Sequence, residues 1–173
     1  MKNDFVKLIL VLTLICLIIS GALAFTNSVT EPIITDAAKA REEAAWYEII
    51  PEADGFTLIE ANGLPSTIRE VYCSSNNVGY IFIVVSSGYG GDIRIICGID
   101  NDGRMISCRA LEHTETKGLG AKITEPQFEN QFSGIDEKME GIVAITGATI
   151  SSKAYISAIG DAFIAYGLIS TNS

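Results

Sequence analysis

Histidine, cysteine, proline and basic side chains are all scarce in this sequence of 173 residues, and each scarcity excludes a class of protein. Cysteine and proline occur four times each, too rarely for a disulfide scaffold or a collagen-like chain. The one histidine, His113, excludes a multi-histidine metal site, and no pair of cysteines has the spacing of a zinc knuckle. The G-x-S-x-G motif of serine hydrolases and the phosphate-binding P-loop are also missing. We therefore expect neither a metal site nor a nucleophilic triad.

Positive charge is limited as well, with 12 basic against 21 acidic side chains. Only Lys2, Lys7 and Asp4 precede residue 26, so the rest of the chain carries 10 basic and 20 acidic side chains, a net charge of −10. Proteins that bind nucleic acid need clustered Lys and Arg to contact phosphates. A nucleic-acid partner is therefore excluded.

Hydrophobic residues make up 48% of the sequence, and an uncharged run covers residues 8–25. A helix of about 18 apolar residues can cross the hydrocarbon layer of a membrane, which is ~30 Å thick. We predict that residues 1–26 form a transmembrane anchor. The alternative is a cleaved signal peptide, because Ala22-Leu23-Ala24 resembles a cleavage site. The apolar run is, however, longer than the ~7–15 residues that a signal peptide usually has.

The charges on either side of this run predict its orientation. Lys2 and Lys7 precede the run, whereas the first charged residue after it is Glu31. Because positively charged flanks remain in the cytoplasm, we expect the N-terminus there. The acidic remainder of the chain is then expected on the extracytoplasmic side of the cell membrane.

The sequence between the apolar run and Pro51 predicts a tether and a helix. Polar residues 26–30 are expected to form the tether. A helix is predicted over residues 37–50, with Thr35 or Asp36 as its cap and the turn-favouring Pro51 after its end.

The remainder of the sequence predicts an α+β fold. Short runs rich in β-branched and aromatic residues, separated by Asn- and Gly-containing turns, predict strands at residues 56–60, 68–73, 80–86, 93–99 and 105–112. Helices are predicted at residues 126–131 and 151–168. Strands in series with helices at both ends are typical of a mainly antiparallel sheet. We therefore divide the chain into the anchor (1–26), the tether and helix (27–50) and a domain (51–173).

The predicted hairpin around Asp102-Gly103 determines which residue lies opposite each of two cysteines. A two-residue turn at these positions pairs residues whose numbers add to 205, which places Cys97 opposite Cys108. In that register the pair falls at a hydrogen-bonded site, where side chains diverge. A type I turn with a bulge would shift the register. Whether the two cysteines form a disulfide is therefore not decided by the sequence.

Two segments of the predicted domain combine glycine with polar side chains. The first, HTETKGLG over residues 113–120, directly follows a predicted strand. Gly118 and Gly120 permit positive φ and a close approach of backbone to a ligand. The segment is either a ligand-binding loop or a solvated turn, and His113 alone is more readily explained as a polar residue at a strand end.

The second segment, TGATISSK over residues 146–153, leads into the final predicted helix. Thr149, Ser151 and Ser152 place hydroxyls where the first amides of a helix lack partners and the helix dipole is positive. At least one of these hydroxyls is expected to cap the helix. The same position also suits a bound anion such as phosphate.

These segments resemble the signatures of the FMN-binding domain family. Thr146-Gly147-Ala148-Thr149, followed by Ile150-Ser151-Ser152, looks like the flavinylation motif of that family, and residues 113–120 resemble its H-x-E-T-P-G-L-G signature. Gly88-Tyr89-Gly90-Gly91 resembles a third, glycine-rich block. With the N-terminal apolar run, the resemblance covers nearly the whole chain. It points to the G subunits of Rnf-type ion-translocating ferredoxin:NAD⁺ oxidoreductases, of which the C subunits of Na⁺-translocating NADH:quinone oxidoreductases are longer relatives.

The resemblance implies a covalent flavin and a place in a membrane complex. Thr149 would carry FMN through a phosphoester made by a separate flavin transferase, with Thr146 as the rival acceptor and Gly147 and Ala148 too small to block the transferase. The chain would be an electron carrier without independent catalysis. Its complex would couple electron transfer from ferredoxin to NAD⁺ with translocation of Na⁺ or H⁺. The expected partners are the other membrane subunits and the transferase.

The resemblance also assigns further contacts to the cofactor. Thr116 and Leu119 are expected to pack against the isoalloxazine ring, and Tyr89 is a weaker candidate for the same contact. The backbone of the loop, which includes Gly118, is expected to hydrogen-bond the polar edge of the ring. Ser151 and Ser152 belong to the motif around the phosphate. Lys153 is the nearest cation in sequence, and it either stabilises the reduced flavin or is a solvent-exposed lysine of the first helical turn.

Two positions depart from the family pattern. Lys117 replaces the usual proline of the loop signature, which should loosen the loop without removing its glycines. Val143 stands where the flavinylation motif begins with aspartate. A carboxylate there could orient the acceptor hydroxyl or be recognised by the transferase, and valine can do neither. The alternative is thus a flavin-free structural subunit, or, after signal-peptide cleavage, a secreted binding protein.

Overall fold

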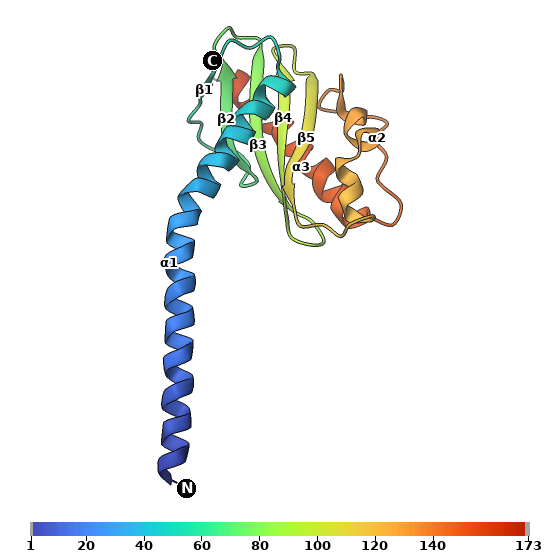
Figure 1. Ribbon diagram of the computed structural model, residues 1–173. Helices are drawn as coiled ribbons and strands as arrows, with labels where there is room; N and C mark the ends of the chain where they lie inside the picture. Colours follow the sequence, from blue (N-terminus) through green and yellow to red (C-terminus); the bar gives the residue numbers. More distant parts are fainter. Residues whose placement is uncertain (1, 172–173) are drawn as a thin grey trace. The chain divides into compact units, whose positions relative to one another are not determined.

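The computed structural model describes residues 2–171 and contains two compact units, one ending at Glu43 and the other beginning at Ala44. The second unit holds a five-stranded antiparallel sheet in the order β1-β2-β3-β4-β5 (Figure 1). The strands are β1 (Phe56–Leu58), β2 (Ile68–Ser74), β3 (Gly79–Ser87), β4 (Asp92–Asp100) and β5 (Met105–His113). They are followed by η1 (Gly120–Thr124), α2 (Pro126–Glu129), η2 (Asn130–Phe132) and α3 (Thr149–Ser170). The predicted α+β fold is confirmed.

The first helix, α1 (Lys2–Ile49), runs through the segment that was predicted to be a tether. Residues 26–30 are helical, and two of their hydroxyls are bonded within the helix: Thr26 Oγ1 donates to the Ala22 carbonyl at 2.9 Å and Ser28 Oγ to that of Phe25 at 2.8 Å. The prediction of a tether was therefore wrong. No helix begins near residue 37, and the side chains of the expected caps, Thr35 and Asp36, lie outside the described residues.

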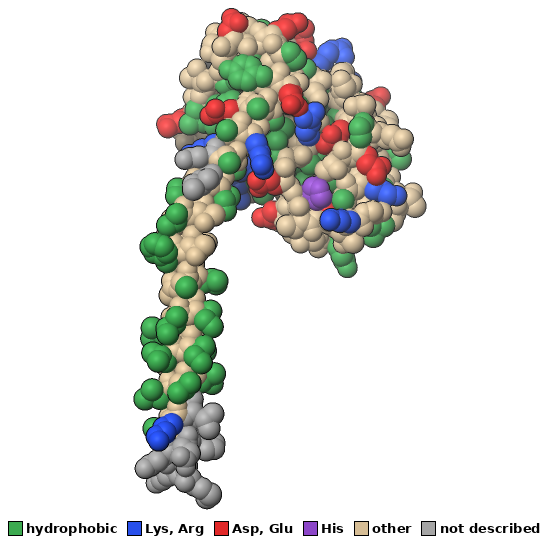
Figure 2. Space-filling model, viewed as in Figure 1, with side chains coloured by type: hydrophobic (Ala, Val, Ile, Leu, Met, Phe, Trp, Pro, Cys, Tyr) green, Lys and Arg blue, Asp and Glu red, His purple; other side chains and the backbone are tan. Residues whose placement is uncertain are grey.

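The apolar run lies within α1. Among the described residues, the Ile9–Ile49 part of this helix contains an 18-residue stretch of mean hydropathy 2.6, long and apolar enough to cross a membrane by length and composition. Figure 2 shows hydrophobic side chains along this part of the helix. A signal sequence near the N-terminus has the same properties. The structure thus supports a membrane-associated segment at the place predicted.

Both faces of β3 and β4 are buried. Successive side chains of a strand point to opposite faces, so alternate residues join different clusters. Side chains on one face pack with α3 in a cluster that includes Phe82, Val84, Ile95, Cys97, Tyr155, Ala158 and Ile159. Those on the other face pack with the end of α1 in a cluster that includes Ala45, Ile49, Ile50, Ile81, Ile83 and Ile96. Gly98 makes this contact possible, since a Cβ there would collide with Cγ2 of Ile49.

The hairpin of β4 and β5 brings two cysteines together. Cys97 pairs with Cys108, which is the pairing expected for a two-residue turn, although the register shifts between Gly98 and Ile99 near the turn. Both thiols are free in the structure. The hydroxyl of Tyr155 donates to Cys108 Sγ at 3.4 Å, and burial raises the pKa of the Cys108 thiol to about 12. Cys108 is therefore a protonated core residue at neutral pH.

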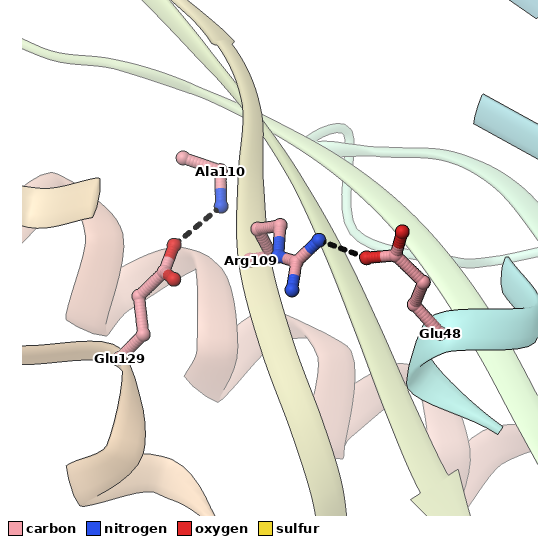
Figure 3. Close-up of polar contacts among 4 residues, drawn as sticks. All are labelled: Glu48, Arg109, Ala110 and Glu129. Carbon is pink, nitrogen blue, oxygen red and sulfur yellow. Dashed lines mark hydrogen bonds and ion pairs between the residues drawn. The ribbon is translucent and has the colours of Figure 1, made fainter. Parts of the chain in front are cut away.

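The outer edge of β5 is occupied by a side chain (Figure 3). Glu129, at the end of α2, accepts a hydrogen bond from the Ala110 amide at 2.9 Å. Arg109 on the same strand forms an ion pair with Glu48 of α1. Burial raises the pKa of the Glu129 carboxyl above its ordinary value, while the Ala110 amide and Arg109 act in the opposite direction. Glu129 thus covers part of an edge that could otherwise pair with another chain.

We predict that the N-terminal segment stays attached to the protein and to the membrane. The reason is the length and uncharged character of residues 8–25. Carbonate washing of membranes should leave the protein in the pellet, and its intact mass should include the residues before Ala24. Release into the supernatant with a new N-terminus near Phe25 would show instead that the segment is a signal peptide.

We also predict that Glu129→Gln changes how stability depends on pH. The folded pKa of Glu129 is raised, so the folded state binds its proton more tightly than the unfolded state, where the pKa is about 4.3. The stabilisation that comes from this tighter binding of the proton is complete below the unfolded pKa and is lost as pH rises through the folded pKa. Glutamine keeps an acceptor for the Ala110 amide and carries no charge. The melting temperature of E129Q should therefore increase relative to wild type as the pH is raised.

The matched control for this measurement is Glu125→Gln. Glu125 is an exposed carboxylate beside the same short helix, and its side chain makes no capping hydrogen bond. The melting temperature of the E125Q variant should follow that of the wild type at every pH. A difference between E129Q and wild type that stays constant from about pH 4 to about pH 7 would contradict the assignment.

Candidate functional site

A pocket of about 330 Å³ lies where three segments of the second unit meet. We call them the glycine loop (residues 88–91, between β3 and β4), the β5 loop (residues 114–119, after β5) and the helix start (residues 146–152). The pocket is lined by Tyr89, Glu115, Thr116, Leu119, Gly120, Gly147, Ala148, Thr149, Ile150 and Ser151. Residues from all three sequence blocks singled out above therefore share one cavity.

The register of the sheet brings the first two segments together. Ile93, at the start of β4, pairs with His113, at the end of β5, so the glycine loop and the β5 loop leave the sheet side by side. The loops are also bonded to each other, because Thr114 Oγ1 donates to the Gly90 carbonyl at 3.0 Å. His113 Nδ1 accepts from the Glu115 amide at 3.2 Å. His113 thus acts at a strand end, as expected for a structural residue.

The helix start differs from the sequence prediction. Ala148 is the N-cap residue of α3, and among the residues that the structure describes no side chain makes a capping hydrogen bond to this helix, so the expectation of a hydroxyl cap was wrong. Ser152 Oγ instead donates to the Ala148 carbonyl at 2.5 Å and accepts from the Ile145 amide at 3.1 Å, which closes the preceding turn. The first amides of α3 are therefore left without a side-chain cap, at the positive end of a 22-residue helix.

A buried carboxylate lies beside this helix start. The Glu115 side chain accepts hydrogen bonds from the Tyr89 amide at 2.8 Å, the Gly90 amide at 3.2 Å and Ser151 Oγ at 2.7 Å. Glu115 is only 6% exposed to solvent. The loop motif in the sequence includes Glu115, but sequence reasoning assigned it no role. The sequence did contain a signal for this role. Glu115 lies between two glycine-containing segments, and Gly88 and Gly120 have no Cβ that would collide with its carboxylate.

The mouth of the pocket is apolar. Tyr89 is 71% exposed, Ile150 56% and Leu119 46%, and all three line the pocket. Aromatic and aliphatic side chains around a pocket that also holds a few polar groups are typical of sites for planar organic ligands. Such a rim suits a flat ring system better than a sugar or a metal ion. Within the described residues, no cluster of three or more His, Cys, Asp and Glu side chains could hold a metal.

The structure brings together most of the residues singled out from the sequence. The lining includes Tyr89, Thr116, Leu119, Gly147, Ala148, Thr149 and Ser151. Four others lie outside the lining: Thr146, Gly118, Ser152 and Lys153. Ser152 is buried with its hydroxyl bonded to the backbone, and Lys153 is exposed. Gly120 and Ile150, which belong to the two sequence motifs, also line the pocket, as does Glu115, for which no role was predicted.

Thr146 and Thr149 differ in their surroundings although both are exposed. Thr149 is the first residue of α3 and lines the pocket, whereas Thr146 precedes the turn at Gly147 and does not. Among the described residues, neither hydroxyl makes a hydrogen bond. A free hydroxyl that faces a cavity at a helix N-terminus is accessible to a reaction partner, so the geometry distinguishes Thr149 from its neighbour.

Comparison with known proteins identifies similar chains. Residues 88–163 match the family model described as FMN-binding domain. The G subunit of a Na⁺-translocating ferredoxin:NAD⁺ oxidoreductase complex of Acetobacterium woodii is 32% identical, over 88% of this chain and 87% of the relative. The G subunit of an ion-translocating oxidoreductase complex of Methanosarcina acetivorans is 30% identical, over 93% and 94%. The corresponding subunit of a proton-translocating complex of Clostridium ljungdahlii is 26% identical, over 87% and 85%.

We predict that Gly147→Ala disturbs the helix start. Gly147 has φ +85°, and a Cβ there would lie 3.3 Å from Leu119 Cδ1. Because the left-handed conformation is unfavourable for alanine, the change should lower the free energy of unfolding by about 1–2 kcal/mol. Chemical denaturation measures this directly.

The control is Gly167→Ala in the same helix. Gly167 lies inside α3 with open space around its Cβ position, so alanine should stabilise the protein there by about 0.5–1 kcal/mol. The two glycine-to-alanine changes should therefore have opposite signs. Equal effects would show that the turn at Gly147 is not under this constraint.

Proposed function

Since the chain belongs to the family of FMN-binding G subunits of ion-translocating oxidoreductase complexes, we propose that it is a redox subunit that carries FMN as a phosphoester on Thr149. It would transfer electrons within a membrane complex and would not turn over a substrate alone. The observation that carries the proposal is the exposed, unbonded hydroxyl of Thr149 in a pocket at an uncapped helix N-terminus.

The residues present fit the two halves of FMN. At one end of the pocket, the amides of the first turn of α3 and the dipole of the helix favour a phosphate ester on Thr149. At the mouth, Leu119, Ile150 and Tyr89 offer apolar surface to the ring system. FMN, when bound, supplies one-electron and two-electron redox chemistry. The protein's own contribution is to hold the cofactor, to orient it and to leave its ring accessible at the surface.

The proposed partners follow from the named relatives. They are subunits of complexes that couple ferredoxin:NAD⁺ electron transfer to translocation of Na⁺ or protons. We propose the same kind of complex here, with the other membrane subunits as partners and a flavin transferase for maturation. The N-terminus would lie in the cytoplasm and the domain outside, because Lys2 and Lys7 precede the apolar run. The G type is favoured over the longer C type, since this chain covers nearly all of its G-type relatives.

A flavin-free structural subunit is the second candidate, and Val143 favours it. Val143 is 67% exposed and lies on the loop before the helix start. Its backbone is fixed by Gln131, whose Oε1 accepts from the Val143 amide at 3.0 Å. The position is therefore ordered and accessible to a modifying enzyme, but it offers no carboxylate. Because the side chain is exposed, aspartate can replace it without loss of core packing.

We predict that Thr149→Ala abolishes covalent flavin and that Thr146→Ala does not. The protein should be co-expressed with its flavin transferase, denatured and separated on a gel, where wild type and T146A give a fluorescent yellow band. Peptide mapping should find the mass of FMN on the peptide that contains Thr149. Flavin retained in T149A, or lost only in T146A, would assign the attachment to another residue.

Val143→Asp distinguishes the two candidate functions. If wild-type protein carries no flavin even with the transferase present, while V143D does, then valine blocks modification and the structural role is correct for the natural chain. Flavin on both proteins would show that the carboxylate is dispensable. Thermal unfolding of V143D should match that of wild type, because the Val143 side chain faces solvent.

A further inference from the structure

We propose that Glu115 is the positioning residue of the flavin pocket. Its carboxylate joins the glycine loop to the first turn of α3 and thereby forms the pocket before a cofactor binds. The identity of the cofactor rests on the proposed function. The hydrogen bonds that carry this inference, however, belong to the protein without flavin.

The two oxygens of Glu115 bond to opposite walls of the pocket. Oε1 accepts from the amides of Tyr89 and Gly90 in the glycine loop, and Oε2 accepts from the hydroxyl of Ser151 in α3. Both oxygens of the side chain therefore act as hydrogen-bond acceptors. In the described part of the chain, Glu115 has no ion-pair partner, so these donors and the positive end of α3 compensate its burial.

Two glycines around the pocket are explained by the same carboxylate, and a third by the backbone next to it. A Cβ at Gly88 would collide with Oε1 of Glu115, and a Cβ at Gly120 would collide with Oε2. A Cβ at Gly90 would collide with the carbonyl of Thr114, the residue before Glu115. Glycine at these three positions therefore lets the backbone close around Glu115.

These contacts connect the ring side of the pocket with the attachment side. Tyr89, at the rim, has its backbone amide held by Glu115, and Ser151 lies two residues after Thr149 in the first turn of α3. One side chain thus sets the separation between the rim and the threonine. Without it, the glycine loop would keep its own turn, in which the Gly88 amide donates to the Gly91 carbonyl at 2.8 Å, but would lose its tie to the helix.

The test measures hydrogen exchange in full-length, detergent-solubilised protein produced without the flavin transferase. Glu115→Ala should accelerate exchange in peptides covering residues 88–91 by at least about tenfold, since the amides of Tyr89 and Gly90 lose their acceptor. Glu115→Gln should stay close to wild type, because its carboxamide oxygen can accept from the same amides and the Ser151 hydroxyl can accept from its amino group. Glu112→Gln is the control, because Glu112 is an exposed carboxylate three residues before Glu115, near the end of β5, and this variant should behave as wild type.

Each outcome decides the proposal. Wild-type exchange of residues 88–91 in E115A overturns it, and so does equally fast exchange in E115Q and E115A. If E115A exchanges rapidly throughout the sheet and is unfolded, Ser151→Ala decides instead: faster exchange at the start of α3 supports the proposal, and wild-type exchange overturns it. All these measurements use flavin-free protein, so the absence of flavin on Thr149 would overturn the proposed function and leave this result standing.

Discussion

The burial of both faces of β3 and β4 is the constraint on which the rest of the domain depends. The hydrophobic side chains on one face are covered by α3, and those on the other face are covered by the end of α1. Because successive side chains of a strand point to opposite faces, the two strands hold both helices in place. With α3 held against the sheet, its first turn lies beside the loops that leave β3 and β5. The pocket is thus a consequence of core packing: it forms at the place where the covering helix begins and the strands end.

Periodicity and turn residues predicted the sheet closely. All five strands and the α+β class follow from alternating apolar residues and from Asn and Gly at turns. The pairing of Cys97 with Cys108 was expected only for a turn without a bulge, and it is present although the register shifts near the turn. The prediction of a tether was wrong because the polar residues 26–30 were assigned to a non-helical segment. Thr26 and Ser28 instead bond to carbonyls of their own helix, an outcome that a propensity rule does not distinguish from a loop.

The sequence singled out segments that line the candidate site, but not the hydrogen bonds that join them. The helix start and the β5 loop were identified, whereas the cap was assigned to a hydroxyl and Glu115 was passed over. Both errors have the same cause, since a hydrogen-bond partner 36 residues away in the sequence is invisible to local reasoning. Ser151 bonds to that distant carboxylate instead of capping its own helix, and Ala148 is the cap residue. The uncapped amides are what make the helix start suitable for an anion.

The end of α1 has a practical consequence for anyone who wants the domain without its membrane segment. Ala45, Ile49 and Ile50 are buried, and they cover Ile81, Ile83 and Ile96 on one face of the sheet. A truncation after Ile50 would therefore expose a flat, aliphatic surface to water and invite aggregation. The compact unit begins at Ala44, so a soluble version should retain the last turns of the helix and remove only what precedes them.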